Sequence, residues 1–369
     1  MWQINKTHKT KPFTLYGISY GTFLAQRFLR LFPAVADSVV LDGAVAHPAT
    51  FNQTVSAADE AFTNLMAFCD KHAGCRAAFN QSSSLTTTGS STRAAAAQII
   101  RTFDSANTTC AQGFRTAMPG VPLAAFVGDN LAYPRIPFGN GSSVDGRGAL
   151  LALLARANRC DATKGDLAYM QLYGASQQAL QALMVPDKGQ SDLLLANIFA
   201  SELARPAVPT LQAFTLAVAQ SSLTVLRTAL YQLVPLIRAW PKYTDTDDNS
   251  WEAPVPQNAR AKVLVLAGDL DPQTQLSQAQ QVVASLTANG LSAELLRVPS
   301  GSHAQGFLHP CATDTIVGFV AATAGSSSAA ACERDVVDLS LLDSVAAGVP
   351  ESAGGRPRRL GRRHLALRA

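Results

Sequence analysis

Apolar and polar positions repeat in two different ways along this chain, and the change from one to the other divides it into segments. Residues 13–16 form a short β-prone run, and residues 23–31 then place apolar side chains at helical spacing. Residues 38–43 are an apolar run that ends in Asp-Gly, which is typical of a buried strand. The pattern predicts a strand, a helix that ends near Pro33, and a second strand parallel to the first.

Helical periodicity dominates the long middle part of the chain. Apolar residues recur at helical spacing in the stretches 57–68, 93–103, 149–157, 167–184, 193–203 and 211–237. Breaks rich in Gly, Ser or Pro lie at 81–92, 139–148 and 240–256. We interpret this part as a mostly helical insertion. Trp240, Tyr243 and Trp251 stand where the insertion returns to the core, and we expect them to pack there rather than to stack on a ligand.

The α/β pattern resumes after the insertion. Strands are predicted at 261–267 and 293–298, with a helix at about 274–288 between them and another at about 312–322. Beyond residue 333 the chain becomes rich in Gly, Ser and Arg, and we expect disorder there. The predicted domains are a core in two parts (1–46 and 256–332), a helical cap (47–255) and a basic tail (333–369).

Composition limits the classes of protein to consider. The chain has 369 residues, of which 47% are hydrophobic and 15% charged, so it can bury a large core and is neither a coiled coil nor a disordered chain. The net charge of +4 arises from the tail, because Arg356, Arg358, Arg359, Arg362, Arg363 and Arg368 fall in its last fourteen positions. Without them the chain is near neutral, so we expect no nucleic-acid partner.

Other sequence features bear on the cellular compartment. No apolar run reaches the roughly 18 residues of a membrane span, and the N-terminus lacks the apolar segment of a signal peptide. Acceptor sites for N-glycosylation nevertheless occur at Asn5, Asn52, Asn80, Asn107 and Asn140. These sites favour a secreted glycoprotein.

The six cysteines point the same way, although 15 pairings are possible. Cys69 and Cys75 flank a short loop, and Cys311 and Cys332 bracket the last helix. With His72 as the one nearby histidine and no Cys-x-x-Cys pair, disulfides are favoured over a zinc site. We expect neither a metal nor a cofactor.

Candidate chemistry begins in the first strand–helix turn. Residues 16–22 read Tyr-Gly-Ile-Ser-Tyr-Gly-Thr, and a Gly-x-Ser-x-Gly between a strand and a helix is the context of a nucleophile elbow. Ser19 is the candidate nucleophile, and the N–H of Tyr20 is placed to donate to an oxyanion. Gly17 and Gly21 would let the turn approach its neighbours. An ordinary glycine-rich turn is the alternative interpretation.

A serine nucleophile needs an imidazole base and a carboxylate that orients it. Asp271 follows the strand 261–267, and His303 follows the strand 293–298. The order Ser, Asp, His is that of α/β-hydrolases, and the carboxyl ends of parallel strands meet at one edge. The alternatives are that Asp271 caps a helix and that His303 is an ordinary loop residue. Asp42 also ends a strand, but we expect it to have a structural role.

Several motifs carry a family resemblance. They are the elbow at 16–22, Leu-Asp-Gly at 41–43, Asn-Ile-Phe-Ala-Ser-Glu-Leu at 197–203, Gly-Asp-Leu-Asp-Pro-Gln-Thr at 268–274, Gly-Ser-His at 301–303, and Cys311. The chain resembles, over roughly residues 13–325, the secreted tripeptidyl-aminopeptidase and prolyl-aminopeptidase group of α/β-hydrolase serine peptidases. The resemblance implies an α/β-hydrolase fold with a mostly parallel sheet and a helical cap. It also implies an exopeptidase that releases short peptides or single residues from a free N-terminus.

The resemblance assigns roles to individual residues. Ser19 would be the nucleophile, Asp271 the acid and His303 the base, and Glu202 in the cap would bind the α-ammonium group of the substrate. A solvated glutamate on a helix face is the alternative for Glu202. Ala304 departs from the family, because the family histidine is flanked by glycine on both sides.

The resemblance also implies about four strands before the elbow, with a loop that supplies a second oxyanion donor. We therefore expect that the chain is N-terminally truncated, with an incomplete sheet, and that a signal peptide was lost with the missing part. Two other functions stay open: an esterase or lipase with the same triad, and a catalytically impaired remnant that acts as a binding protein. We expect a peptide partner and no membrane span, and the oligomeric state is open.

Overall fold

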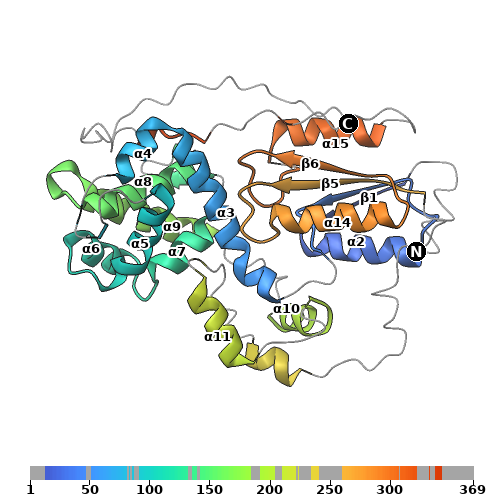
Figure 1. Ribbon diagram of the computed structural model, residues 1–369, viewed down its shortest axis with the longest axis horizontal. Coiled ribbons are helices and arrows are strands. Elements are labelled where there is room, and N and C mark those ends of the chain that lie inside the picture. The colour runs from blue at the N-terminus through green and yellow to red at the C-terminus, as the bar shows by residue number, and fades with distance from the viewer. Residues whose placement is uncertain are drawn as a thin grey trace.

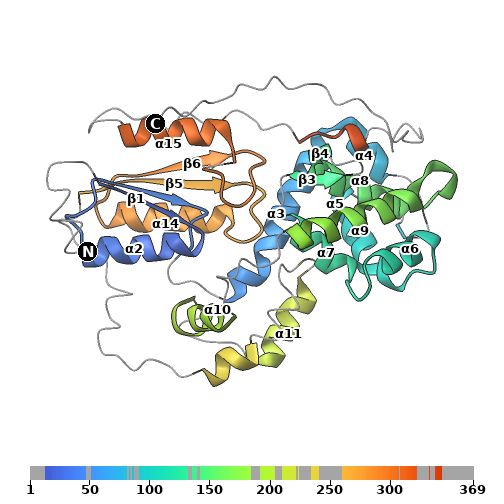
Figure 2. The ribbon, with the colours of Figure 1, turned by 180° about the vertical axis from the view of Figure 1, so that it is seen from behind.

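The structure is a computed structural model. It describes residues 13–46, 51–80, 83, 85–86, 91–131, 135–138, 142–183, 192–203, 210–221, 223, 234–240, 260–306, 308–321, 332 and 337–342. A layered α/β core lies beside a helical body, and α3 (Phe51–Lys71) runs from one to the other (Figures 1 and 2). The α/β class predicted from the sequence, with a parallel sheet and a large helical insertion, is confirmed.

The core sheet contains four described strands, all parallel. They are β1 (Thr14–Ile18), β2 (Ser38–Asp42), β5 (Lys262–Gly268) and β6 (Ala293–Val298), and they lie side by side in the order β1-β2-β5-β6. Ile18 pairs with Asp42, and Asp42 pairs with Leu266. This register brings the carboxyl ends of the strands to one edge of the sheet, so the loops that follow them converge there.

Helices cover both faces of this sheet. On one face α2 (Tyr20–Leu31) and α14 (Leu276–Ala288) pack on alternate strand residues, including Val39, Leu41, Val263 and Val265. On the other face α15 (Pro310–Ala321) packs on the intervening residues, including Val40, Leu264, Leu266 and Leu296. The alternation follows from the two-residue period of a strand, and burial on both faces explains why these strands read as continuous apolar runs.

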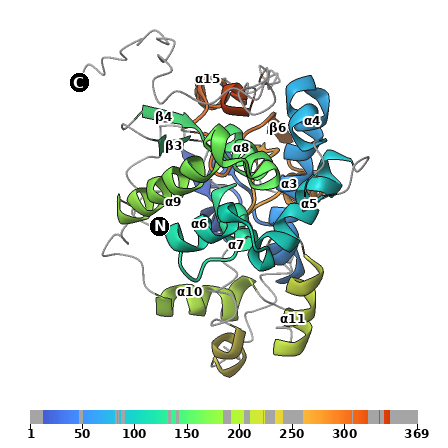
Figure 3. The same ribbon diagram turned by 90° about the vertical axis from the view of Figure 1, so that its left-hand side faces the viewer.

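The helical body is built around one buried helix, α8 (Gly146–Arg159), whose residues 146–158 are all buried. Its other described elements are α4 (Ala73–Phe79), α5 (Thr92–Thr102), α6 (Thr109–Ala117), α7 (Leu123–Asn130), α9 (Asp166–Leu183) and a hairpin of β3 (Arg135–Phe138) and β4 (Ser142–Asp145). Figure 3, seen from the side of this body, shows its helices in front of the strands. The helices α5 and α9 were predicted, whereas α4, α6, α7 and the hairpin were not. The strand β4 and the start of α8 occupy part of the break expected at 139–148.

A further helical part lies beside both bodies (Figure 1). It comprises α10 (Asp192–Ile198), the π-helical turn Phe199–Leu203 and α11 (Leu211–Gln220). The single helix predicted over 211–237 is wrong, because α11 stops at Gln220 and Ser221 is extended. The carboxylate of Asp59 on α3 accepts hydrogen bonds from the Ser221 hydroxyl (2.6 Å) and the Leu223 N–H (3.0 Å), which favours the break.

Aromatic packing follows the expectation at one of three positions. Trp240 lies against a small buried cluster that includes Phe214 and Ile237, and its Nε1 donates to Asn197 Oδ1 (3.0 Å). It is therefore half-buried and packs against this cluster, as predicted. Tyr243 and Trp251 lie outside the described residues.

The segment after α15 contradicts the expected disorder at one place. Val337, Leu339 and Leu342 are buried against the helical body, where a Cβ added to Gly148 would overlap the carbonyl of Asp338. Residues 337–342 are thus part of the packed structure. This packing arises because apolar side chains recur every two or three residues in this segment. The prediction missed them because the tail as a whole is rich in glycine and arginine.

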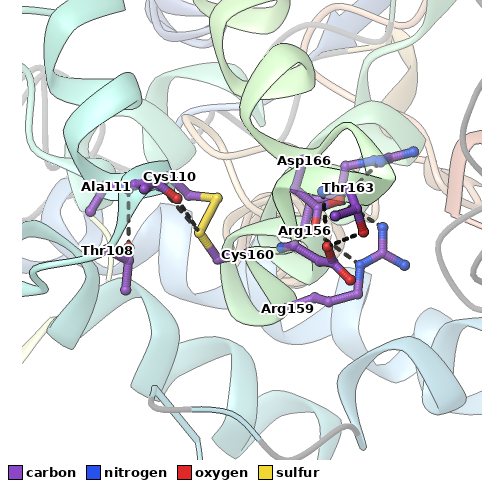
Figure 4. Close-up of a disulfide and its surroundings, with 10 residues drawn as sticks. Thr108, Cys110, Ala111, Arg156, Arg159, Cys160, Thr163 and Asp166 are labelled. Carbon is purple, nitrogen blue, oxygen red and sulfur yellow. Dashed lines mark hydrogen bonds and ion pairs between the residues drawn. A yellow bond between two sulfur atoms is a disulfide. The ribbon is translucent and has the colours of Figure 1, made fainter.

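All six cysteines form disulfides, Cys69–Cys75, Cys110–Cys160 and Cys311–Cys332. Figure 4 shows Cys110–Cys160 near a buried charge cluster on α8 and α9. Asp166, which is fully buried, accepts from Arg156 (3.0 Å) and Arg159 (2.6 Å). Buried charges are tolerated when they are paired in this way.

Candidate active site

The strand–helix turn holds Ser19 in a strained conformation. Ser19 has φ 54° and ψ −126°, a region that residues other than glycine rarely occupy. Its N–H donates to the carbonyl of Asp42 (2.9 Å), and its own carbonyl accepts from the N–H (2.9 Å) and the hydroxyl (2.6 Å) of Thr22. The main chain on both sides of Ser19 is therefore fixed, as a nucleophile elbow requires.

The two glycines of the motif differ. A Cβ at Gly17 would lie 2.5 Å from the carbonyl oxygen of Gly21, so residue 17 must be glycine. A Cβ at Gly21 would meet no described atom within 4 Å, so the steric role predicted for Gly21 is wrong. Tyr20 begins α2, and its N–H has no partner within the helix. Its use as an oxyanion donor stays a prediction.

Asp271 and His303 meet at the carboxyl ends of β5 and β6. His303 Nδ1 lies 2.8 Å from Asp271 Oδ2, and Asp271 is buried. The N–H groups of Gln273 and Thr274 (both 2.8 Å) and the Thr274 hydroxyl (2.7 Å) also donate to this carboxylate. The helix-cap alternative for Asp271 does not hold, because Gln275 is the N-cap of α14.

The carboxylate sets the protonation of the imidazole. With Asp271 as acceptor, Nδ1 carries the proton and Nε2 is left as the basic nitrogen. Burial of the ring disfavours its charged form, but Asp271 and then Asp42 favour it, and the net effect raises the pKa of His303 above its ordinary value. His303 is thus a stronger base than a free imidazole.

His303 lies against the residue that follows Asp42. Gly43 has φ 65°, and a Cβ there would lie 3.0 Å from His303 Cε1 and 2.8 Å from Thr274 Oγ1. Asp42 in turn holds the N–H of Ser19. The structure therefore brings Ser19, Asp271 and His303 to the same edge of the sheet, although within the described part no hydrogen bond joins the Ser19 hydroxyl to His303.

The loop that carries His303 has two strained residues. Ser300 has φ 60° and Ala304 has φ 59°, both in the left-handed region that favours glycine. Ala304 is a position at which the family resemblance implies glycine. The backbone conformation explains why glycine would suit it.

Glu202 also reaches the elbow. It lies in the π-helical turn after α10, is half-buried, and accepts a hydrogen bond of 2.5 Å from the Tyr20 hydroxyl. Burial, together with this bond, raises the pKa of Tyr20 above its ordinary value. This bonded, half-buried position does not fit a glutamate on a solvated helix face, but whether Glu202 binds an ammonium group stays a prediction.

Sequence reasoning missed two other residues around the site. Asp42 was assigned only a general structural role, yet its side chain bonds to the His303 loop. Arg147 on α8 is buried, forms an ion pair with Asp145 (2.6 Å) and donates to the carbonyl of Ser300 in the same loop. The position of Asp42 at a strand end was a usable signal for the first, whereas nothing in the local sequence marks Arg147.

The structure also bears on metals and membranes. Among the described residues, the one group with metal-ligand types at short range is His309, Cys311 and Cys332, and its two cysteines form a disulfide. That group therefore offers a single imidazole. None of the described helices has the length and hydropathy needed to cross a bilayer.

Comparison with known proteins adds little to this geometry. No family model and no curated protein matches the sequence. Among solved structures, the chain is similar to a highly thermostable carboxyl esterase from Bacillus coagulans in complex with glycerol, with 11% identity and a TM-score of 0.30. The alignment covers 86% of this chain and 66% of the esterase, so the chain spans just under two thirds of the esterase's length. Any assignment of function must therefore rest on the site itself.

Proposed function

We propose that this protein is a serine hydrolase of the α/β-hydrolase type, and that it removes short peptides or single residues from a free peptide N-terminus. Ser19 is the nucleophile, His303 the general base and Asp271 the acid that orients it. The observation that carries the proposal is the Asp271–His303 pair (2.8 Å) at the same sheet edge as a serine held at φ 54° between a parallel strand and a helix. The three disulfides support a site of action outside the cytosol.

Acylation follows from these positions. Ser19 Oγ attacks the substrate carbonyl while its proton passes to Nε2 of His303, and Asp271 stabilises the imidazolium that forms. The N–H of Tyr20 donates to the oxyanion at the positive end of α2. His303 then gives its proton to the leaving amine as the peptide bond breaks, so the amine is released and the N-terminal fragment stays bound as an acyl ester on Ser19.

Deacylation reverses these roles. His303 takes a proton from a water molecule, the hydroxide equivalent attacks the ester carbonyl, and Ser19 Oγ leaves with the proton held by His303. The product is a free carboxylic acid. Ester substrates would follow the same path, so the triad alone does not distinguish a peptidase from an esterase.

Glu202 supplies the preference for a free N-terminus in this proposal. Its carboxylate lies at the side chain of Tyr20, directly after the nucleophile, and an ammonium group near the scissile bond would find it within reach. A charge-assisted hydrogen bond of this kind contributes about 1.5–3 kcal/mol. The Tyr20 hydroxyl would hold the carboxylate in place.

Hydrolysis of matched substrates tests the proposal. We expect an N-terminally free tripeptide or prolyl amide reporter to be cleaved, and its blocked analogue to be cleaved poorly. Ser19→Ala should abolish turnover, whereas Ser285→Ala, on the exposed face of α14, should not. Cleavage of simple esters with no cleavage of either peptide would favour the esterase, and no turnover of any substrate would favour the binding protein.

A second variant tests the role of Glu202. Glu202→Gln should reduce the ratio of kcat/KM for free over blocked substrate by about 10- to 100-fold, which corresponds to the loss of one charge-assisted contact. Tyr20→Phe keeps the carboxylate and the main-chain N–H but removes the hydroxyl that holds the carboxylate, so it should reduce the ratio less than Glu202→Gln does. An unchanged ratio in Glu202→Gln would contradict the assignment.

A further inference from the structure

Asp42 contacts both the elbow and the His303 loop. It is the last residue of β2, between β1 and β5, and it is buried. Its main-chain carbonyl accepts the N–H of Ser19 (2.9 Å). The backbone of Asp42 thus helps to fix the position of the nucleophile. The side chain of Asp42 bonds to different residues.

That side chain holds the loop after His303. Asp42 Oδ1 accepts the N–H of Gln305 (2.9 Å), and Oδ2 accepts the N–H of Gly306 (2.7 Å) and the hydroxyl of Tyr16 (2.8 Å). Tyr16 lies on β1, three residues before Ser19. One carboxylate therefore joins the nucleophile strand to the loop of the base.

The surrounding residues leave room for this contact. A Cβ at Gly306 would overlap the Tyr16 hydroxyl and lie 2.9 Å from Asp42 Oδ2. Glycine at 306 thus lets the loop backbone approach the carboxylate. All three partners are donors, which favours the ionised carboxylate, since a protonated one would place a fourth hydrogen among them.

The carboxylate also acts on the imidazole through space. The pKa of Asp42 is raised above its ordinary value, because burial outweighs the lowering effect of Gly306, Tyr16, Gln305 and His303. In the described part of the chain, the ionisable groups that act on His303 are Asp271, by direct contact, and Asp42, by charge alone. In a buried site such a charge is poorly screened.

We propose that Asp42 is a positioning residue that fastens the His303 loop to the nucleophile strand, and whose negative charge supports the imidazolium formed during turnover. Asp271 fixes the ring and its tautomer, whereas Asp42 fixes the distance between the loop and the elbow. This proposal rests on the proposed function, but its structural and electrostatic parts can be measured without substrate.

The test is an NMR titration of the His303 ring in the full chain, assigned by its loss in His303→Gln. We expect Asp42→Asn to lower the pKa of His303 and to accelerate amide hydrogen exchange at Gln305 and Gly306 at least tenfold. Asp37→Asn is the matched control: Asp37 also accepts a main-chain N–H, from Phe13 (2.7 Å), but at the opposite end of β2. It should change neither quantity. Tyr16→Phe removes a donor that fixes Asp42 Oδ2, so exchange at Gly306 should accelerate. The charge of Asp42 is kept, so the pKa of His303 should not fall.

Kinetics separate this proposal from the function it rests on. If the enzyme turns over substrate, Asp42→Asn should lower kcat about tenfold or more with little change in KM, and move the acid limb of the pH profile to lower pH. An unchanged His303 pKa in Asp42→Asn would overturn the electrostatic role even in an active enzyme. If Asp42→Asn does not fold, amide exchange at Gly306 is compared between Tyr16→Phe and a control variant, Thr14→Val. The control removes the Thr14–Ser38 hydroxyl contact at the other end of β1. Equal exchange at Gly306 in these two variants would overturn the positioning role.

Discussion

The strand-end edge of the core and the helical body are both built around buried carboxylates, but the surroundings of those carboxylates differ. Asp166 in the helical body is neutralised by two arginines, Arg156 and Arg159. Asp42 and Asp271 at the sheet edge receive main-chain N–H groups, hydroxyls and one imidazole, and no arginine or lysine pairs with either among the described residues. Removal of one partner from a fully paired buried charge destabilises a fold, whereas carboxylates held by dipoles keep their negative charge available to a neighbour that becomes positive.

Asp271→Asn should have the largest effect, and mainly on chemistry. An amide in place of the carboxylate favours the wrong tautomer of His303, and we expect kcat to fall about 10⁴-fold. The unfolding midpoint in urea should change little by comparison. Asp269→Asn, which removes an exposed ion pair with Arg297 nearby, should leave kcat close to that of the wild type. Equal losses in the two variants would contradict the role of Asp271.

Asp166→Asn should show the reverse. Two buried guanidinium groups would lose their shared partner, which costs about 3–5 kcal/mol of unfolding free energy. The effect is measured by urea denaturation, and kcat per folded molecule should remain within a few-fold of the wild type. Asp161→Asn, at a more exposed carboxylate beside the same cluster, should destabilise far less. A large loss of kcat in well-folded Asp166→Asn would remove the distinction between the two regions.

At the sheet edge, activity and stability should depend on pH in opposite directions. Burial lowers the pKa of His303, but Asp271 and Asp42 outweigh it and raise the pKa above its ordinary 6.5. Because the base must be neutral, kcat/KM should fall as pH drops through this raised pKa. The stabilisation of the folded state by the charged pair runs the other way: it is complete below about 6.5 and is lost as pH rises through the raised pKa. Urea midpoints of wild type and His303→Gln, measured from pH 5 to 9, should converge at the alkaline end.

The smallest effect is expected from Ala304→Gly. The left-handed backbone of Ala304 costs about 1–2 kcal/mol, part of which is regained by glycine and part lost to the entropy of the unfolded chain. We expect a stability gain of about 0.5 kcal/mol in urea denaturation. Ala284→Gly on the exposed face of α14 makes the same change in a helix and should instead cost about 1 kcal/mol. The same sign in both variants would show that residue 304 is unstrained.

Local patterns predicted the core better than the helical body. The units β1–α2–β2 and β5–α14–β6 were placed to within a few residues, because strand and helix periods in each are set by burial on the sheet. The same placement predicted that Ser19, Asp271 and His303 would share an edge. The sequence could not show that α11 ends at Gln220, because the hydrogen bond that favours the break joins Ser221 to Asp59, 162 positions away.

Side-chain contacts across long sequence separations were also beyond prediction. Asp42 was recognised only as a strand-end residue, because its partners Gln305 and Gly306 lie more than 260 positions further on. The steric role given to Gly21 was wrong because the motif marks where glycine is customary, whereas only the packed backbone shows that Gly17 alone is crowded.

Covalent labelling with a fluorophosphonate, read by peptide mass spectrometry across pH, tests the central claim most directly. The account predicts a single adduct on Ser19, formed at a rate that rises with pH through the pKa of His303. The adduct should be lost in Ser19→Ala and formed far more slowly in His303→Gln. Labelling of a different serine, or a labelling rate at Ser19 that is the same in His303→Gln, would contradict the proposed triad.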